Sequence, residues 1–358
     1  MPAIRLSSFL GLLFTAGILA ACGGGGPPNL GGGAPGTPTP QPSVTFGPTA
    51  SPSPVPTPPF IYTASQSNVG VFTAASTGNT PPVFALSGSL SQIVRPLGLS
   101  VDSAGNLYVI DNGFVPGKAD VEVFAAGANG NVAPIRTITS ASFSNPVSIA
   151  LDSANNIYVA DTNSGILKFV AGSNGNAVPV SQILPQTSDG SGGYVAASAD
   201  GVAVDSNGAI YCLCQPNGSG GVPSVTVYAP GSTGNVPPAT SFDASATGTL
   251  TSIAIAANNT IYTGGTQSGA PSIAAFTNTG GVITPGNVIT GSSTLLRSGP
   301  VAIGIDSAGN IYAADNTANA IDVFAAASTG NVAPTSVIQG PATLLNFNTT
   351  VGNVLTVR

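Results

Sequence analysis

Histidine and tryptophan are both absent from the 358-residue chain, and charged residues make up only 6% of it. Because histidine is the commonest general base and metal ligand, its absence excludes a conventional Ser-His-Asp triad and favours a function other than catalysis. The absence of tryptophan removes the best side chain for stacking against sugar rings. The 7 Lys and Arg residues form no basic run, against 13 Asp and Glu residues, so we expect no nucleic-acid partner.

The first 21 residues have the pattern of an export signal. Arg5 supplies a positive charge, and the apolar stretch from Leu6 to Ile18 is too short for a permanent membrane-spanning helix. The stretch ends in Leu19-Ala20-Ala21-Cys22, which resembles the lipobox of bacterial lipoproteins. That resemblance implies a signal peptide over residues 1–21, a lipidated Cys22, and an exported, membrane-anchored chain. Gly23 after the cysteine implies the outer membrane if the host is Gram-negative.

Residues 22–59 follow with a composition dominated by Gly, Pro, Ser and Thr. Such a segment has too few apolar side chains to offset the entropy lost on ordering. We therefore predict that it is a disordered linker, which joins the lipid anchor to a folded domain at residues 60–358.

Beyond residue 60 one pattern recurs at intervals of about 50 residues, a period typical of four short strands in one propeller blade. An Ile/Leu-Tyr pair marks each unit, with its tyrosine at Tyr62, Tyr108, Tyr158, Tyr211, Tyr262 and Tyr312. A second aromatic residue follows at Phe72, Phe124, Phe169, Tyr228, Phe276 and Phe324. The polarity of the residues before it alternates, as in Val121-Glu122-Val123-Phe124, which predicts a strand with one buried face.

Turn residues follow the second aromatic position of each unit. They are Gly78-Asn79, Gly130-Asn131, Gly175-Asn176, Gly234-Asn235 and Gly330-Asn331, with Gly280-Gly281 in the fifth unit. Both residue types tolerate the positive φ that tight turns need. A further run, rich in small residues and ending in Asp-Ser, is typical of the innermost strand of a blade, where neighbouring blades converge.

The run with Asp-Ser is missing from the first unit, so the strand order leaves one blade incomplete. The segment Thr349 to Val357 can supply the missing strand and close the ring against the strand of Tyr62. Closure also removes exposed strand edges. We therefore predict an all-β fold: a six-bladed β-propeller of four-stranded blades, preceded by the disordered N-terminal tether.

The repeats resemble those of NHL-repeat propellers and of the wider six-bladed group that includes gluconolactonase-like proteins. The resemblance depends on the pattern P-x-x-I-x-x-D-S-x-G-N-I-Y-x-A-D, which is complete from Pro300 to Asp315 and less perfect from Pro96 and from Pro146. It covers nearly all of residues 60 to 358. It implies the fold but no single function, because such propellers include binding modules, lyases and lactonases.

One set of aspartates begins the Ser-x-Gly/Asn turns, where a carboxylate can accept hydrogen bonds from backbone amides a few residues on. We interpret these as structural turn residues: Asp102, Asp152, Asp205 and Asp306.

A second set of aspartates, Asp111, Asp161 and Asp315, ends the tyrosine strand on the opposite rim. Carboxylates around one channel could hold Ca²⁺, and the gluconolactonase-like resemblance allows a metal there. Against this, the resemblance implies a Glu/Asn/Asp cluster, whereas the only glutamate, Glu122, lies in a later strand. We favour hydrogen bonding between blades as their role, and expect no cofactor.

Cys212 and Cys214 flank Leu213 on a predicted strand, so their thiols point to the same face. Alternate Cα atoms of an extended strand lie about 6.5 to 7 Å apart, at the edge of disulfide reach. Two thiols without histidine cannot make a standard zinc site. We therefore favour two free thiols that pack as small hydrophobic side chains over a strained bridge.

The function favoured by these features is a non-enzymatic binding or scaffold module on a lipid tether, which contacts a protein, peptide or glycan through one face of the ring. One alternative is a metal-dependent hydrolase of lactonase type that uses Asp111, Asp161 and Asp315. Another is a passive surface or matrix protein, suggested by the composition, which is rich in Gly, Ser, Thr and Asn.

Overall fold

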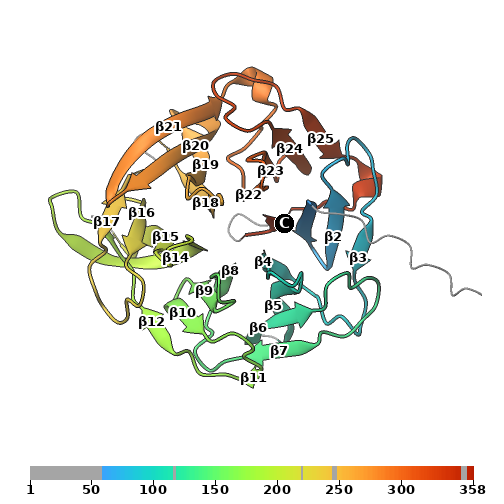
Figure 1. The fold of residues 1–358 in the computed structure, drawn as a ribbon, viewed down its shortest axis with the longest axis horizontal. Coiled ribbons are helices and arrows are strands. Elements are labelled where there is room, and N and C mark those ends of the chain that lie inside the picture. Colours follow the sequence, from blue (N-terminus) through green and yellow to red (C-terminus); the bar gives the residue numbers. More distant parts are fainter. Residues whose placement is uncertain (1–58, 116–117, 219–220, 244–247, 348–352) are drawn as a thin grey trace, which may run out of the picture. The chain divides into compact units, whose positions relative to one another are not determined.

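The computed structural model describes residues 59–115, 118–218, 221–243, 248–347 and 353–358. These residues form six sheets around a common axis, and the four strands of each blade are antiparallel (Figure 1). Each sheet contains the four strands of one blade, so the predicted six-bladed β-propeller is confirmed. The predicted signal peptide, Cys22 and nearly all of the predicted linker lie outside the described residues.

The first three blades use the N-terminal half of the domain. Blade 1 consists of β26 (Leu355–Val357), β1 (Phe60–Ser65), β2 (Asn68–Thr73) and β3 (Phe84–Leu86). Blade 2 consists of β4 (Pro96–Val101), β5 (Leu107–Val115), β6 (Lys118–Phe124) and β7 (Arg136–Thr139). Blade 3 consists of β8 (Pro146–Leu151), β9 (Ile157–Asp161), β10 (Gly165–Phe169) and β12 (Ser181–Ile183), while β11 (Gly175–Asn176) pairs with β7 of blade 2.

The other three blades complete the ring. Blade 4 consists of β14 (Tyr194–Val204), β15 (Ile210–Pro216), β16 (Ser224–Tyr228) and β17 (Thr240–Phe242), with β13 (Gln186–Ser188) paired to the start of β14. Blade 5 consists of β18 (Leu250–Ile255), β19 (Ile261–Gln267), β20 (Ala270–Thr279) and β21 (Val282–Thr290). Blade 6 consists of β22 (Ala302–Ile305), β23 (Ile311–Asp315), β24 (Ala320–Phe324) and β25 (Ser336–Gln339). Two 3₁₀ turns, η1 (Ser292–Thr294) and η2 (Pro341–Thr343), lie between blades.

The C-terminal strand closes the ring as the sequence predicts. In blade 1, β26 is the innermost strand and pairs antiparallel with β1, so that Tyr62 lies opposite Thr356. Figure 1 shows the C-terminal end at the centre of the ring, beside β22 of blade 6. A Cβ atom at Gly304 of β22 would collide with the side chains of Leu355 and Val357. Because Gly304 has no side chain, β26 can pack closely beside β22.

The hydrophobic core lies between blades rather than within one sheet. Five clusters of buried side chains each combine residues from neighbouring blades, and the largest joins blades 6, 1 and 2. Because neighbouring blades cover both faces of a blade, its second and third strands are largely buried, most completely in β23 and β24. The expectation of one buried face for the segment around Glu122 is therefore wrong: Glu122 is fully buried.

The antiparallel strand order gives the ring two different rims. The repeat rim carries the turns between first and second strands and the loops between third and fourth strands: residues 74–83, 102–106, 125–135, 152–156, 170–180, 205–209, 229–239, 256–260, 280–281, 306–310 and 325–335. The variable rim carries the turns between second and third strands and the connections between blades. Its described residues are 66–67, 87–95, 140–145, 162–164, 184–193, 217–218, 221–223, 243, 248–249, 268–269, 291–301, 316–319, 340–347 and 353–354.

On the repeat rim, the predicted Gly-Asn turns join each blade to the one before it. Within the described residues a turn of this kind forms a parallel bridge to the outer strand of the preceding blade in five places: Gly78 to Ile338, Gly130 to Leu86, Gly175 to Ile138, Gly234 to Ile183 and Gly330 to Ile289. The asparagine adds a side-chain bond, because Oδ1 of Asn131 accepts from the amide of Leu90 at 2.7 Å. We call these contacts the interblade clasps.

Blade 5 departs from this arrangement. Its Gly280-Gly281 pair, where the other blades have Gly-Asn, forms the turn of the long β20–β21 hairpin, with Thr279 opposite Val282. In the part of the chain that the structure describes, no bridge connects this turn to β17 of blade 4. The loss of asparagine thus coincides with the loss of a clasp.

Candidate functional site

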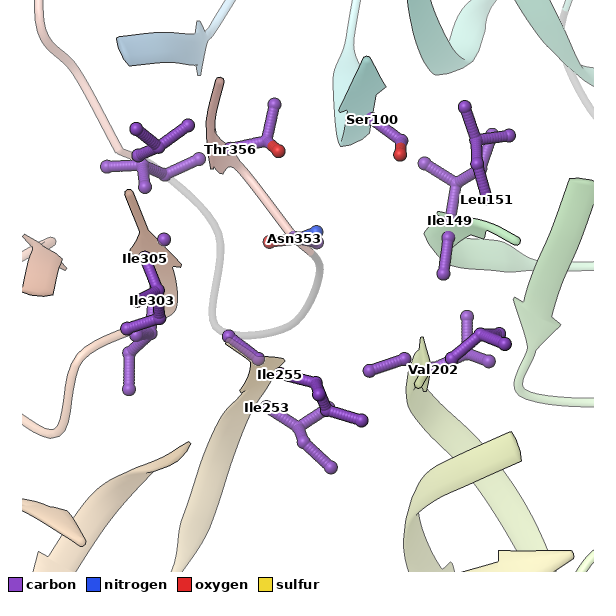
Figure 2. A pocket seen from close by; sticks show the side chains of 17 residues that line it. Ser100, Ile149, Leu151, Val202, Ile253, Ile255, Ile303, Ile305, Asn353 and Thr356 are labelled. Carbon is purple, nitrogen blue, oxygen red and sulfur yellow. The ribbon is translucent and has the colours of Figure 1, made fainter. Parts of the chain in front are cut away.

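The innermost strands enclose a channel of about 160 Å³ on the axis of the ring (Figure 2). The residues that line it are mainly aliphatic, among them Ile253, Ile255 and Ile303 (Figure 2), but the surface exposed to the channel is largely polar, because Ile253 and Ile303 are buried in the cores between blades. Ser100, Asn353 and Thr356 supply the polar side chains of its lining, which contains no charged residue in the part of the chain that the structure describes. Among the described residues, the carboxylates of the ring therefore lie away from this channel.

The aspartates of the variable rim do not line this channel, and each is buried in its own blade. Asp161 makes the most hydrogen bonds to backbone amides of the three. Its Oδ2 accepts hydrogen bonds from the amides of Ser144 and Asn145 at 2.7 and 2.9 Å, and its Oδ1 accepts from Asn163 and Ser164. One carboxylate thus fixes both its own turn and the connection from blade 2.

The other two carboxylates repeat this arrangement. Asp111 accepts from the amides of Val94 and Arg95 through Oδ2 and from Gly113 through Oδ1. Asp315 accepts through Oδ2 from the amide of Arg297, and through Oδ1 from Ser298 and from two amides of its own turn. Each carboxylate thus uses both of its oxygens in hydrogen bonds to the protein. Among the described residues, no three acidic or cysteine side chains lie together in a metal-binding arrangement.

The aspartates of the repeat rim organise the turns that follow them. Oδ1 of Asp306 accepts from the amides of Ala308 and Asn310 at 2.9 and 2.8 Å, and its Oδ2 accepts from the hydroxyl of Tyr312 at 3.0 Å. Asp102, Asp152 and Asp205 make the same contacts to residues two, four and six positions on. The tyrosine of the repeat is therefore a partner of the turn, which links two recurring features of the pattern into one unit.

Two further buried acids, Glu122 and Asp322, were not among the site residues expected from the sequence. Glu122 in β6 and Asp322 in β24 lie at equivalent positions, each opposite the residue that follows the tyrosine of its blade. Both Oε atoms of Glu122 and the Oδ2 atom of Asp322 have no hydrogen-bond partner. The signal in the sequence is an acid between apolar neighbours of a strand, which alternation alone assigns to a solvent-facing side.

The other blades show that the fold does not require an acid at this position. The equivalent residues, identified by strand register, are Gly70, Leu167, Thr226 and Ala274. Burial raises the pKa of Glu122 to about 9, and the negative charges of Asp111 and Asp120 add to the effect. Burial likewise raises the pKa of Asp322 to about 7, with Asp315 raising it further and Arg297 lowering it. Both acids are therefore costly to ionise.

Asp322 differs from Glu122 in that a described pocket reaches it. A pocket of about 270 Å³ lies between the connection from blade 5 and the outer strands of blade 6. Leu295, Leu296 and Val337 contribute apolar lining, and Arg297 lines it as an exposed cation. We call this the Asp322 pocket.

Cys212 and Cys214 form a disulfide bond within β15, with their Cα atoms 5.4 Å apart. The expectation of two free thiols is therefore wrong. The Cα separation is shorter than that of alternate residues in an extended strand and falls within the usual disulfide range. Both residues are fully buried, and the Sγ atom of Cys214 also contacts the Thr226 hydroxyl at 3.2 Å.

No protein-family model matches the sequence, and no curated protein matches it. Solved structures do resemble it in fold. A protein of unknown function from Bacteroides caccae gives a TM-score of 0.53 at 9% identity, over 84% of this chain and 99% of the other. A protein from Lactobacillus plantarum gives 0.51 at 14% identity, over 78% and 82%.

A candidate 6-phosphogluconolactonase from Bacteroides fragilis gives a TM-score of 0.47 at 16% identity, over 76% of this chain and 92% of the other. At such identities, the likeness to the structures from Bacteroides caccae and Lactobacillus plantarum shows the fold alone. In the part of the chain that the structure describes, no helix has the length and apolarity needed to cross a membrane.

Proposed function

We propose that this chain is an exported lipoprotein of the cell envelope that presents its propeller as a non-enzymatic binding or scaffold module. The export signal and Cys22 support the anchor, and the composition of residues 22–59 supports a flexible tether. The proposed partner is a protein or peptide that docks on the variable rim. The absence of tryptophan makes a glycan the less favoured ligand.

The observation that carries this proposal is the contrast between the two rims. On the repeat rim, four turns use the same aspartate contacts, and five interblade clasps recur within the described residues. On the variable rim, the segments range from the tight turn at 66–67 to the connection 184–193, which carries β13. A rigid scaffold that holds dissimilar loops on one side is the usual arrangement of a recognition surface.

The connection between blades 3 and 4 provides the most prominent part of this surface. Ala197 of β14 lies opposite Pro216, the last residue of β15. The residues of β14 before Ala197 have no partner in β15 and pair with β13 instead. Tyr194 begins β14 and is 42% exposed. An exposed tyrosine on a hairpin is a favourable contact residue for a protein partner.

The rival function, a metal-dependent hydrolase of lactonase type, requires open carboxylate ligands. The candidates are Asp111, Asp161 and Asp315, and each already accepts hydrogen bonds through both carboxylate oxygens. The donors are backbone amides and, at Asp315, also the hydroxyl of Ser298. Metal binding would have to displace these donors, which also hold the connections between blades. We therefore propose the binding module in preference to the hydrolase.

Crosslinking in intact cells, followed by mass spectrometry, tests the proposal. We expect one dominant partner with the unmodified chain and its loss with Tyr194→Ala. Val180→Ala is the matched control, because Val180 is an exposed apolar residue of the repeat rim. Equal recovery from both variants would contradict docking on the variable rim. Metal-dependent turnover of a lactone panel would favour the hydrolase, and no specific partner with normal fitness on deletion would favour a passive surface protein.

The anchor is tested separately by mass spectrometry of the mature N-terminus. We expect a diacylated cysteine at position 22 and release of Cys22→Ala from the membrane fraction. An unmodified Cys22 in the membrane fraction would contradict lipidation.

A further inference from the structure

The Asp322 pocket combines features that a purely structural position does not need. Asp322 is 1% exposed, yet its Oδ2 atom has no hydrogen-bond partner and its side chain lines the pocket. A buried polar atom without a partner is destabilising unless a ligand or solvent satisfies it. At the equivalent position of blade 3 the chain has Leu167, which packs in the core between blades 2 and 3.

The charges around the pocket define what would satisfy Asp322. Asp315, on the neighbouring strand β23, accepts four hydrogen bonds and is fully buried. Arg297, in the connection between β21 and β22, is the cation that acts on Asp322, but it is exposed to solvent. Two carboxylates are thus opposed by one screened guanidinium, which leaves the interior with a negative field.

The rest of the lining limits the size and polarity of a ligand. Leu295, Leu296, Ala320 and Val337 present aliphatic surface between the exposed side and Asp322. The volume of about 270 Å³ suits a small molecule rather than a folded segment. A cationic hydrogen-bond donor on a short aliphatic chain matches all three properties: it can bond to Oδ2, offset the negative field and pack against the leucines.

We propose that the Asp322 pocket binds a small primary amine, whose ammonium group donates a hydrogen bond to Asp322 and whose aliphatic part contacts Leu295 and Leu296. The pocket opens on the variable rim, so this inference deepens the proposed binding function by naming one class of ligand. It is independent of whether a protein also docks there, because it is tested with a small molecule alone.

Binding should depend on pH in a defined direction. An ammonium ion is attracted to the ionised form of Asp322, and the pKa of this group is raised to about 7 by burial and by Asp315, with Arg297 opposing. Affinity for an amine is therefore expected to increase from pH 6 to pH 8. A neutral alcohol of the same length should show no such increase.

The test uses the full chain with n-butylammonium as the probe and butan-1-ol as its uncharged counterpart, measured by isothermal titration calorimetry and saturation-transfer NMR. We expect saturable binding of n-butylammonium at millimolar concentrations, at least about tenfold weaker in Asp322→Asn, which removes a charge-assisted bond. Asp322→Leu, which introduces the residue type that blade 3 has at this position, should fold and lose binding. Glu122→Leu, which removes the equivalent acid of blade 2, should bind as the unmodified chain does.

Three results would overturn the proposal. The first is an absence of n-butylammonium binding to a chain whose circular dichroism shows the folded state. The second is equal affinity for butan-1-ol, which would indicate an apolar pocket without charge recognition. The third is binding that is unaffected by both substitutions of Asp322. None of these results bears on the crosslinking experiment with Tyr194→Ala, so the two proposals fail separately.

Discussion

The amide of Gly78 donates a hydrogen bond to the carbonyl oxygen of Val337 at 2.6 Å, which joins the first blade to the sixth. The reciprocal bond runs from the amide of Gln339 to the carbonyl oxygen of Gly78 at 3.0 Å. The two residues belong to opposite ends of the domain, so this clasp forms only when the ring closes. The C-terminal strand β26 closes the same gap from the inside.

Removal of residues 353–358 should therefore destabilise the whole ring. The deletion exposes Ile61 and Tyr62 of β1 and removes the buried side chains of Val354 and Leu355. At about 1.5 to 3 kcal/mol for each buried aliphatic side chain, we expect a loss of at least about 3 kcal/mol in the free energy of unfolding. Urea denaturation measures it, with Thr356→Ser as the control. A deletion variant as stable as that control would show that β26 is dispensable.

Gly340 should not tolerate a side chain. Its φ is 131°, and a Cβ atom there would collide with Oδ1 of Asn79, the asparagine of the clasp between blades 1 and 6. We expect Gly340→Ala to lower the free energy of unfolding by about 2 kcal/mol through backbone strain and a displaced asparagine. Gly286→Ala is the control, because Gly286 lacks a positive φ and its nearest neighbour would lie 3.3 Å away. Equal melting temperatures for the two variants would contradict the clasp.

Glu122 should make the protein less stable as pH rises. The folded chain retains its proton to about pH 9, whereas an unfolded chain releases it near 4.5. Between these values the folded state binds more protons than the unfolded state, so the free energy of unfolding decreases with increasing pH.

Replacement of Glu122 by leucine, the residue found at the equivalent position 167, should reduce the decrease of the free energy of unfolding with pH. We expect Glu122→Leu to be more stable than the unmodified chain by about 2 kcal/mol at pH 8 and closer to it at pH 5. Denaturation curves at the two pH values give the comparison. A stability difference that does not change with pH would mean that Glu122 titrates normally in the folded state.

Asp161 should be the most sensitive of the rim aspartates to neutral substitution, because it accepts four backbone hydrogen bonds. In Asp161→Ala these amides lose their buried acceptor, and we expect a loss of about 3 kcal/mol. Asp189→Ala serves as the control, since Asp189 bonds only within an exposed turn. Thermal unfolding of both variants, with and without Ca²⁺, also measures any metal effect. A melting temperature of the unmodified chain raised by Ca²⁺ would revive the metal hypothesis.

The disulfide between Cys212 and Cys214 predicts the outcome of thiol titration. In the denatured mature chain with a lipidated Cys22, no thiol should react before reduction, and two should react after it. Reactive thiols in the unreduced, denatured chain would indicate that this pair is free.

The architecture could be predicted from the sequence because it depends on local and repeated signals. Tyr62 and its five counterparts, the Gly-Asn turns and the Asp-Ser turns each reflect contacts within a few residues or within one hairpin, and their period counts the blades. The closing strand was predictable because the first unit lacks its Asp-Ser run. The pairing of Tyr62 with Thr356 agrees with that expectation.

The roles of the buried acids could not be predicted in the same way. Alternating polarity around Glu122 indicates one covered face, but in a closed ring the neighbouring blade covers the other face as well. The bond between Cys212 and Cys214 depends on the local shape of β15, which brings the Cα atoms closer than an ideal strand allows.

By itself, the sequence determined the number of blades, the strand that closes the ring and the aspartates that organise its turns, because these follow from local hydrogen bonding and from repetition. Only the tertiary structure decided that Asp111, Asp161 and Asp315 bind backbone amides in separate blades, and that Asp322 reaches a pocket with an unsatisfied oxygen. The first property depends on how the two inner strands of each blade pair, and the second on how the connection from blade 5 packs against the strands of blade 6.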